Sequence, residues 1–229
     1  MKLPRYQDFI DELAVGRVYG AFIDDSGLPG LSSTPEHLHP QRKSWVAVVV
    51  PPHQMGEVLQ EFPRALDELK RVTGATEFHF ADIYAGRKEF AKDKVGLQVR
   101  LSIFRFMAYI FTTYELPILV QTFDPDTLRD FRTRGNFPDK ISAFDLRKPQ
   151  DAALFLLLIR IKWYLQDAVI KGKARVFVDE GYKKNGLALR LPFWESVFSD
   201  GLVCFAKSSA VLPIQLADLP HFVSTEHSY

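Results

Sequence analysis

The sequence predicts an α/β protein in which helices cover both faces of a mixed β-sheet. This prediction rests on the order of its segments: short apolar stretches rich in Val, Ile and Phe alternate with longer stretches of helical periodicity. The size and composition also fit one globular domain, because 229 residues with 47% hydrophobic and 25% charged side chains exclude a disordered, collagen-like or disulfide-rich chain. We therefore expect a single domain over residues 1–229.

The first part of the chain predicts two strands joined by a loop. Residues 15–24 (VGRVYGAFID) have the composition of a strand and end in an acid. Residues 28–42 collect Pro, Gly and Ser, which predicts an irregular connection. Residues 44–50 (SWVAVVV) form a nearly continuous apolar strand, as is typical of a central position. Pro51 stops this strand because proline cannot donate to a strand ladder.

Two helices and a third strand follow. Residues 54–72 carry apolar side chains at spacings of three and four, which predicts an amphipathic helix ended by Gly74. Residues 93–114 are apolar over most of a helix circumference, so we expect a helix packed between other layers. Residues 116–123 predict a strand. Residues 124–150 mix proline, glycine and alternating charge, which predicts a short helix within an exposed excursion.

The rest of the chain continues the alternation. Residues 151–170 predict a long helix, and residues 174–178 (ARVFV) predict a strand that, like the first, runs into an acid. We expect a short helix over 185–191, a strand over 202–206 and a final helix from Ile214 onward. Because strands and helices alternate throughout, the sheet should receive helices on both sides.

Charge and cysteine content restrict the functional classes. The 29 basic residues nearly balance 28 acidic ones, so the chain has no broad basic field to hold a nucleic-acid duplex by charge alone. Cys204 is the single cysteine and lies in an apolar stretch, which indicates a buried small hydrophobe in a reducing compartment. The charged N-terminal stretch lacks a signal-peptide core, and the longest apolar run, 152–159, is too short to cross a bilayer. We expect a cytoplasmic protein without a membrane span.

Two acids stand at the ends of predicted strands, Asp24 and Asp179. Because open α/β sheets bind ligands beyond the carboxyl ends of their strands, neighbouring strands would bring these two carboxylates together. Like charges at such close range require a cation or a proton between them, and carboxylate oxygens select Mg²⁺ or Mn²⁺. Ordinary turn chemistry is the alternative for each acid. Asp25 and Glu180, which follow them, are expected to be solvated or outside the ligand set.

Two further segments carry polar residues at suggestive spacing. Glu77 and His79 share one face of an extended stretch, which fits a metal ligand beside a proton carrier, or alternatively a surface carboxylate–histidine pair. Gln215 and Asp218 share one face of a helical turn in the apolar segment PIQLADL. Asp218 can serve the same cluster, or it can cap a helix before Pro220.

These pieces together resemble a known bacterial and phage family, domain of unknown function 3800. The resemblance spans nearly the whole chain and rests on AFIDDSG at 21–27, EFH at 77–79, VFVDEG at 176–181, KSS at 207–209 and IQLADL at 214–219. It implies a ribonuclease H-like fold. Enzymes of that fold hold two Mg²⁺ or Mn²⁺ ions with about four carboxylates and cleave phosphodiesters.

The resemblance also implies roles for individual residues. It places the metal ligands, and with His79 the catalytic set, at Asp24, Glu77, Asp179 and Asp218. Ser208 and Gln215 fall on accompanying polar positions and are expected to contact the substrate. Lys183, Lys184 and Lys207 lie beside these motifs and can contact phosphate oxygens, or alternatively form a solvated surface.

The function that follows is a metal-dependent phosphodiesterase, most simply a nuclease, whose partner is nucleic acid held by local phosphate contacts. The alternative is a non-catalytic binding or regulatory protein of a phage-defence or toxin-type system on the same fold. An enzyme acting on a small phosphorylated molecule is a further class. The sequence leaves open DNA against RNA, endonuclease against exonuclease action, and oligomeric state.

Overall fold

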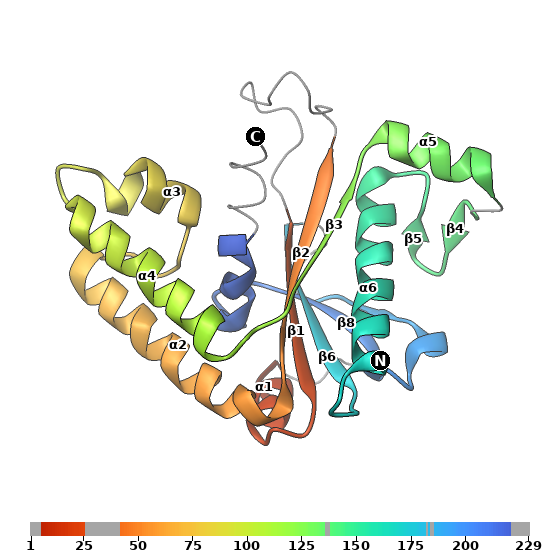
Figure 1. The fold of residues 1–229 in the computed structure, drawn as a ribbon, viewed down its shortest axis with the longest axis horizontal. Coiled ribbons are helices and arrows are strands. Elements are labelled where there is room, and N and C mark those ends of the chain that lie inside the picture. Colours follow the sequence, from red (N-terminus) through yellow and green to blue (C-terminus); the bar gives the residue numbers. More distant parts are fainter. Residues whose placement is uncertain (1–5, 26–41, 136–137, 182, 184–185, 221–229) are drawn as a thin grey trace.

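The computed structural model describes residues 6–25, 42–135, 138–181, 183 and 186–220. A mixed six-stranded sheet with the order β3-β2-β1-β6-β8-β7 runs through the middle of the molecule (Figure 1). Its strands are β3 Ile118–Phe123, β2 Lys43–Val50, β1 Tyr19–Asp25, β6 Ala174–Asp179, β8 Phe198–Ala206 and β7 Ala188–Arg190. The pairs β1–β6 and β6–β8 are parallel, and the other pairs are antiparallel. The predicted α/β class with a mixed sheet is therefore confirmed.

Helices cover both faces of the sheet, as predicted (Figure 1). One face carries α1 Tyr6–Ala14, α2 Pro52–Thr73, α3 Phe80–Ala85, α4 Leu97–Thr113 and the 3₁₀ helices η1 Lys88–Phe90 and η3 Leu212–Ala217. The other face carries α5 Pro125–Arg134, α6 Pro149–Asp167 and η2 Pro192–Trp194, together with a hairpin of β4 Lys140–Ile141 and β5 Phe144–Asp145. None of these described helices is both long and apolar enough to cross a membrane.

The two cores follow from the alternation of side chains along the central strands. Phe22 and Phe177 face α2, where their rings stack with centroids 5.9 Å apart. Ile23 and Val178, the next residue in each strand, face α6. Because successive side chains point to opposite faces of a sheet, Asp24 lies on the α2 side with Phe22. Asp179 lies on the same side with Phe177.

The helix expected over 54–72 is confirmed as α2, which ends at Gly74 in the left-handed conformation (φ 79°). The helix expected over 93–114 forms as α4, but its expected place between two layers is wrong. Its buried side chains lie along one side and include Ile103, Met107 and Ile110, whereas others on the helix, such as Tyr109, are exposed. An apolar helix surface therefore faces solvent.

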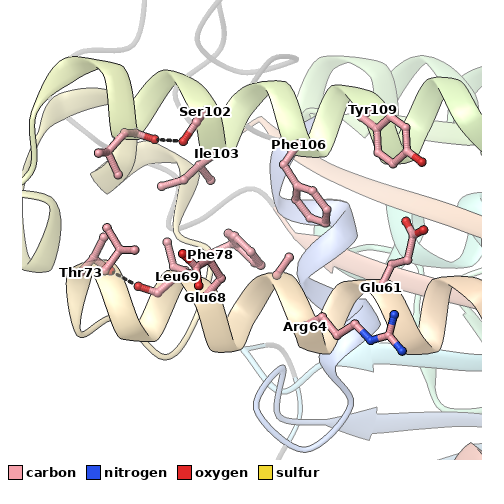
Figure 2. A pocket seen from close by; sticks show the side chains of 13 residues that line it. Glu61, Arg64, Glu68, Leu69, Thr73, Phe78, Ser102, Ile103, Phe106 and Tyr109 are labelled. Atoms are coloured by element: carbon pink, nitrogen blue, oxygen red, sulfur yellow. Dashed lines mark hydrogen bonds between the residues drawn. The ribbon is translucent and has the colours of Figure 1, made fainter.

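A groove of about 580 Å³ opens between α2 and α4 (Figure 2). Leu69 of α2 and Ile103 and Phe106 of α4 form its apolar walls, and Phe78 lies between the two helices (Figure 2). Glu61 and Arg64 of α2 provide polar groups along one side. The groove lacks the aspartates of the sheet end, and so it is separate from the site predicted there.

Four expectations at the level of elements need correction. The short helix over 185–191 is wrong, because β7 pairs antiparallel with β8 there. The first strand begins at Tyr19 rather than Val15, and the helix α1 before it was not predicted. The final helix expected from Ile214 onward begins as the 3₁₀ helix η3 at Leu212 and is helical over 218–220, and the rest of it lies outside the described residues. The excursion over 124–150 contains its predicted short helix, but buried Phe144 anchors it to α6.

The expected loop at 28–42 lies almost wholly outside the described residues.

Candidate metal centre

The parallel pairing of β1 and β6 brings Asp24 and Asp179 to the same end of the sheet. The register pairs Ile23 with Val178, the residues immediately before these two acids. Both acids lie on the α2 side, and both are partly buried. The prediction that the two strand ends meet is confirmed.

The third acid, Asp218, reaches this place from the end of η3, which packs against β1. Its Oδ2 accepts a hydrogen bond of 2.9 Å from the backbone N–H of Phe80, the first residue of α3. The alternative interpretation, a helix cap before Pro220, is not what the structure has: Asp218 is the C-cap residue of η3 and has helical backbone angles (φ −66°, ψ −38°). Its carboxylate, however, bonds a different element, so it links η3 to α3 beside the sheet end.

The charges of these acids influence one another. Burial raises the pKa of Asp24 well above its usual range, and the negative charges of Asp218 and Asp179 raise it further. Burial also raises the pKa of Asp179, although hydrogen bonds from the backbone oppose the shift. The carboxylates therefore lie close enough to repel, and a positive charge placed among them would relieve the repulsion.

The pKa of Asp218 is raised to about 6, mainly by burial. The hydrogen bond from Phe80 and the nearby His79 oppose this shift, and the charges of Asp82 and Asp179 add to it. His79 is therefore close enough to Asp218 to exert an electrostatic effect. Asp218 couples the two strand-end acids to the segment that carries His79.

Asp25 is not the solvated residue that its position in the sequence suggests. Its side chain is only 15% exposed and forms an ion pair with Lys43 at the start of β2, where the lysine side chain is 6% exposed. Asp25 thus has a cation of its own, which the sequence analysis missed. The available signal was a lysine at the start of a strand that is otherwise nearly all apolar.

Gly181 leaves open a space between two of the carboxylates. A Cβ at this position would lie 3.5 Å from Asp25 Oδ1 and 3.6 Å from Asp179 Oδ2. Those two oxygens are therefore at most about 7 Å apart. The backbone N–H of Gly181 also donates to Asp179 Oδ2 at 3.3 Å. Sequence reasoning overlooked this residue, although glycine follows the acid pair in the motif VFVDEG.

Glu77 and His79 lie next to each other, with 3.3 Å between Glu77 Oε2 and His79 Nε2. Ser208 Oγ donates to the same Glu77 oxygen at 3.3 Å. The contact is the one that the surface-pair alternative expects. The imidazole is 57% exposed, so it is open to solvent on one side while it adjoins Asp218 on the other. Glu77 thus contacts His79, which acts electrostatically on Asp218.

Gln215 holds this segment in place through two hydrogen bonds. Its side chain is buried, and its Oε1 accepts a hydrogen bond of 2.9 Å from the backbone N–H of Phe78. Its Nε2 donates to the backbone oxygen of Ser208 at 3.4 Å. Gln215 therefore positions the segment that carries Glu77 and His79, and its contact with a substrate stays a prediction.

The predicted lysines are distributed around the same end of the sheet. Lys207 lies 3.8 Å from Glu180, so the acid after Asp179 has a cationic neighbour. Lys183 lines a polar cavity on the α6 side. Lys184 lies outside the described residues.

The donor set is suited to a hard cation, since it consists of carboxylate oxygens without cysteine. In the part of the chain that the structure describes, however, no group of three or more His, Cys, Asp or Glu side chains could hold a metal ion as it stands. The three aspartates thus gather at one end of the sheet without forming a closed set of ligands.

Comparisons with protein-family models, with curated proteins and with solved structures find no match for this chain.

Proposed function

We propose that this protein is a metal-dependent phosphodiesterase that cleaves nucleic acid with Mg²⁺ or Mn²⁺ bound at the ends of β1 and β6. The observation that carries the proposal is the mutual repulsion of Asp24, Asp179 and Asp218. These partly buried acids come from three elements, and their pKa values are raised. Strained carboxylates of this kind are characteristic of functional sites, because a well-packed fold gains nothing from them.

Asp24, Asp179 and Asp218 would hold the cation, and Glu77 would join them to complete the four ligands that the family resemblance implies. The ligands stand apart in the described structure, so binding requires their side chains to rotate inward. A divalent ion bound there would favour this rotation, because attraction to the metal would replace the repulsion among the aspartates. The bound metal would supply Lewis-acid chemistry, by which a water is activated and the leaving oxygen is stabilised.

His79 and Ser208 act around the carboxylates. The exposed imidazole can pass a proton between solvent and the leaving oxygen at Nε2, which also lies beside Glu77. Ser208 orients Glu77 through its hydroxyl. Lys43 neutralises Asp25, so the cation binds the three remaining aspartates instead of a fourth.

The ribonuclease H-like fold is part of the same proposal. Two features support it: the mixed sheet with helices on both faces, and the acids that end two adjacent parallel strands. The motifs that carry the family resemblance fall on β1, β6, η3 and the segment before α3, which all meet at this end of the sheet.

The absence of a ready ligand group among the described residues favours the alternative of a non-catalytic protein. In that case the protein is a binding or regulatory component of a phage-defence or toxin-type system on the same fold. Its aspartates would then remain without a divalent ion.

The test uses single-stranded and double-stranded DNA and RNA with Mn²⁺. We expect the wild-type protein to cleave at least one of them, and Asp24→Asn and Asp179→Asn to lower cleavage by about 100-fold or more. Asp167→Asn is the matched control, because Asp167 is an exposed acid in the last turn of α6. Cleavage that persists in both site variants would disprove the assignment of the site. Calorimetry without Mn²⁺ binding, together with no cleavage of any substrate, would favour the binding protein.

A further inference from the structure

The polar cavity that Lys183 lines lies on the α6 side of the sheet, at the end where the aspartates gather. Its volume is about 560 Å³, within the range of ligand sites. Lysines from three different segments line it: Lys140 of the β4–β5 hairpin, Lys148 before α6, and Lys183 after β6. Ammonium groups converging from separate elements form a place for an anion rather than an ordinary solvated helix face.

The cavity and the carboxylate site lie at the same end of the central strands, on opposite faces of the sheet. Gln150, which lines the cavity, accepts at its backbone oxygen a hydrogen bond of 3.1 Å from Trp45 Nε1. Trp45 is the cross-strand partner of Asp25 in the β1–β2 pair. Lys183 approaches from the other side, four residues after Asp179. A strand of nucleic acid that passes over this end of the sheet would contact the aspartates on one face and the lysines on the other.

The lining carries three lysines against two aspartates, Asp145 and Asp151, so its formal charge is positive. Arg147 binds Asp145 through two hydrogen bonds of 2.7 Å, from Nε to Oδ1 and from Nη2 to Oδ2. Asp151 is buried and accepts a hydrogen bond of 2.8 Å from the backbone N–H of Asp145, so it fastens the hairpin to the first turn of α6. The start of the long helix α6 adds the positive end of its dipole.

We propose that this cavity binds a backbone phosphate of a nucleic-acid strand, a few nucleotides away from the phosphate at the aspartates. The inference rests on the proposed function and extends it: the substrate is a polynucleotide strand rather than a small phosphodiester. Lysine suits this role because its contact with phosphate is independent of base sequence. Because the total charge of the chain is near zero, we expect nucleic acid to bind at this local group of lysines and not over a broad basic surface.

The experiment measures binding without cleavage. A fluorescently labelled single-stranded oligonucleotide is titrated in EDTA with the wild-type protein and with Lys140→Ala/Lys148→Ala. Both lysines are exposed, so the double variant should keep its fold, and thermal unfolding checks this. We expect about 10-fold weaker binding, and a slope of log K against log salt that is smaller by about 0.7, the value for one phosphate contact on a single strand.

The chain offers a matched control at the opposite end of α6. Lys171 and Lys173 line a cavity of about 640 Å³ before β6, far along the strand from Asp179. Lys171→Ala/Lys173→Ala removes the same charge and should leave affinity and salt slope near those of the wild-type protein. Equal losses in both double variants would overturn the proposal, because they would show a general effect of charge.

Two further measurements separate the remaining outcomes. If inorganic phosphate binds the wild-type protein and not Lys140→Ala/Lys148→Ala, while oligonucleotide affinity is the same in both, the cavity serves a small phosphate compound and the strand proposal is wrong. Failure of the proposed function has a different signature, since wild-type protein then cleaves nothing in Mn²⁺ and still loses oligonucleotide affinity when Lys140 and Lys148 are replaced.

Discussion

Lys43 forms a buried ion pair with Asp25, the residue that directly follows Asp24 in β1. The pair sits on the α6 side of the sheet end, and its lysine lies 5.6 Å from the centre of the Trp45 ring. A single cation is therefore fixed next to the aspartate cluster by the fold itself. It offsets one of the acids and leaves Asp24 and Asp179 for another cation.

Replacing Lys43 by methionine should destabilise the protein by up to about 3 kcal/mol, because the change leaves Asp25 partly buried beside Asp179 without its partner. Urea unfolding in EDTA measures the effect. The double variant Lys43→Met/Asp25→Asn should recover most of the loss, since it removes the stranded charge. Equal stability of the single variant and the wild-type protein would show that the ion pair contributes nothing.

The metal-free protein should become more stable as the pH falls from 7 to 5. Folded Asp218 has a pKa of about 6, against 3.8 as the ordinary value, so between these values the folded state binds more protons than the unfolded state. Between pH 7 and pH 5 only one pH unit lies below the folded pKa, so this residue contributes about 1.4 kcal/mol, the value of one pKa unit. Above pH 6 the repulsion is fully present.

Urea midpoints at pH 5 and pH 7 in EDTA, for the wild-type protein and Asp218→Asn, measure this dependence. The asparagine keeps an oxygen for the Phe80 N–H and has no charge to titrate. We expect a smaller pH difference in the variant than in the wild-type protein. An identical difference in both would mean that Asp218 does not titrate in this range.

Gly181→Ala should weaken Mn²⁺ binding by about 10-fold with little effect on stability. The new methyl group would make ordinary contacts with Asp25 Oδ1 and Asp179 Oδ2, and it would restrict the space in which Asp179 Oδ2 turns toward an ion. Calorimetry with Mn²⁺ measures the affinity. Gly56→Ala is the control, because a Cβ there has no atom within 4 Å. Undiminished affinity in Gly181→Ala would show that the ion does not use this space.

Gln215→Met should cost about 1–3 kcal/mol of stability, because it leaves the backbone N–H of Phe78 buried without its acceptor. The same change should speed hydrogen exchange at the Phe78 amide and lower any Mn²⁺-dependent activity, since Glu77 and His79 flank that residue. Gln166→Met, on an exposed part of α6, should leave all three unchanged. If Gln215→Met lowers activity while exchange and stability stay the same, Gln215 contacts the substrate after all.

The sheet and the pairing of its acids could be predicted because they depend on local pattern. A run such as VFVDEG shows both the buried strand and the acid at its end. Two such runs predict two acids at the same end of the sheet. The segment 185–191 shows the limit of this approach, since a short apolar run fits a helix or a strand equally well. Only its pairing with β8 decides, and that partner lies further along the chain.

The rest of the site depends on contacts that no local pattern contains. Gln215 reads as a polar residue on a helical turn, yet its carbonyl oxygen bonds the backbone of a segment 137 positions earlier. Lys43 reads as a surface lysine before a strand, yet the fold buries it against Asp25. The apolar circumference of α4 predicted complete burial, and it could not show that the structure covers only one side.

The order of the elements around the aspartates bears on how the protein folds. Asp24 lies on β1 near one end of the described chain, and Asp218 follows η3 near the other, while β1 and β6 can pair only after a long crossover connection closes. No short segment therefore carries the site. We expect it to form late in folding, after the distant segments that carry Asp24 and Asp218 have packed together. A ligand that binds there stabilises the native state against global unfolding, so its occupancy should govern resistance to proteases throughout the molecule.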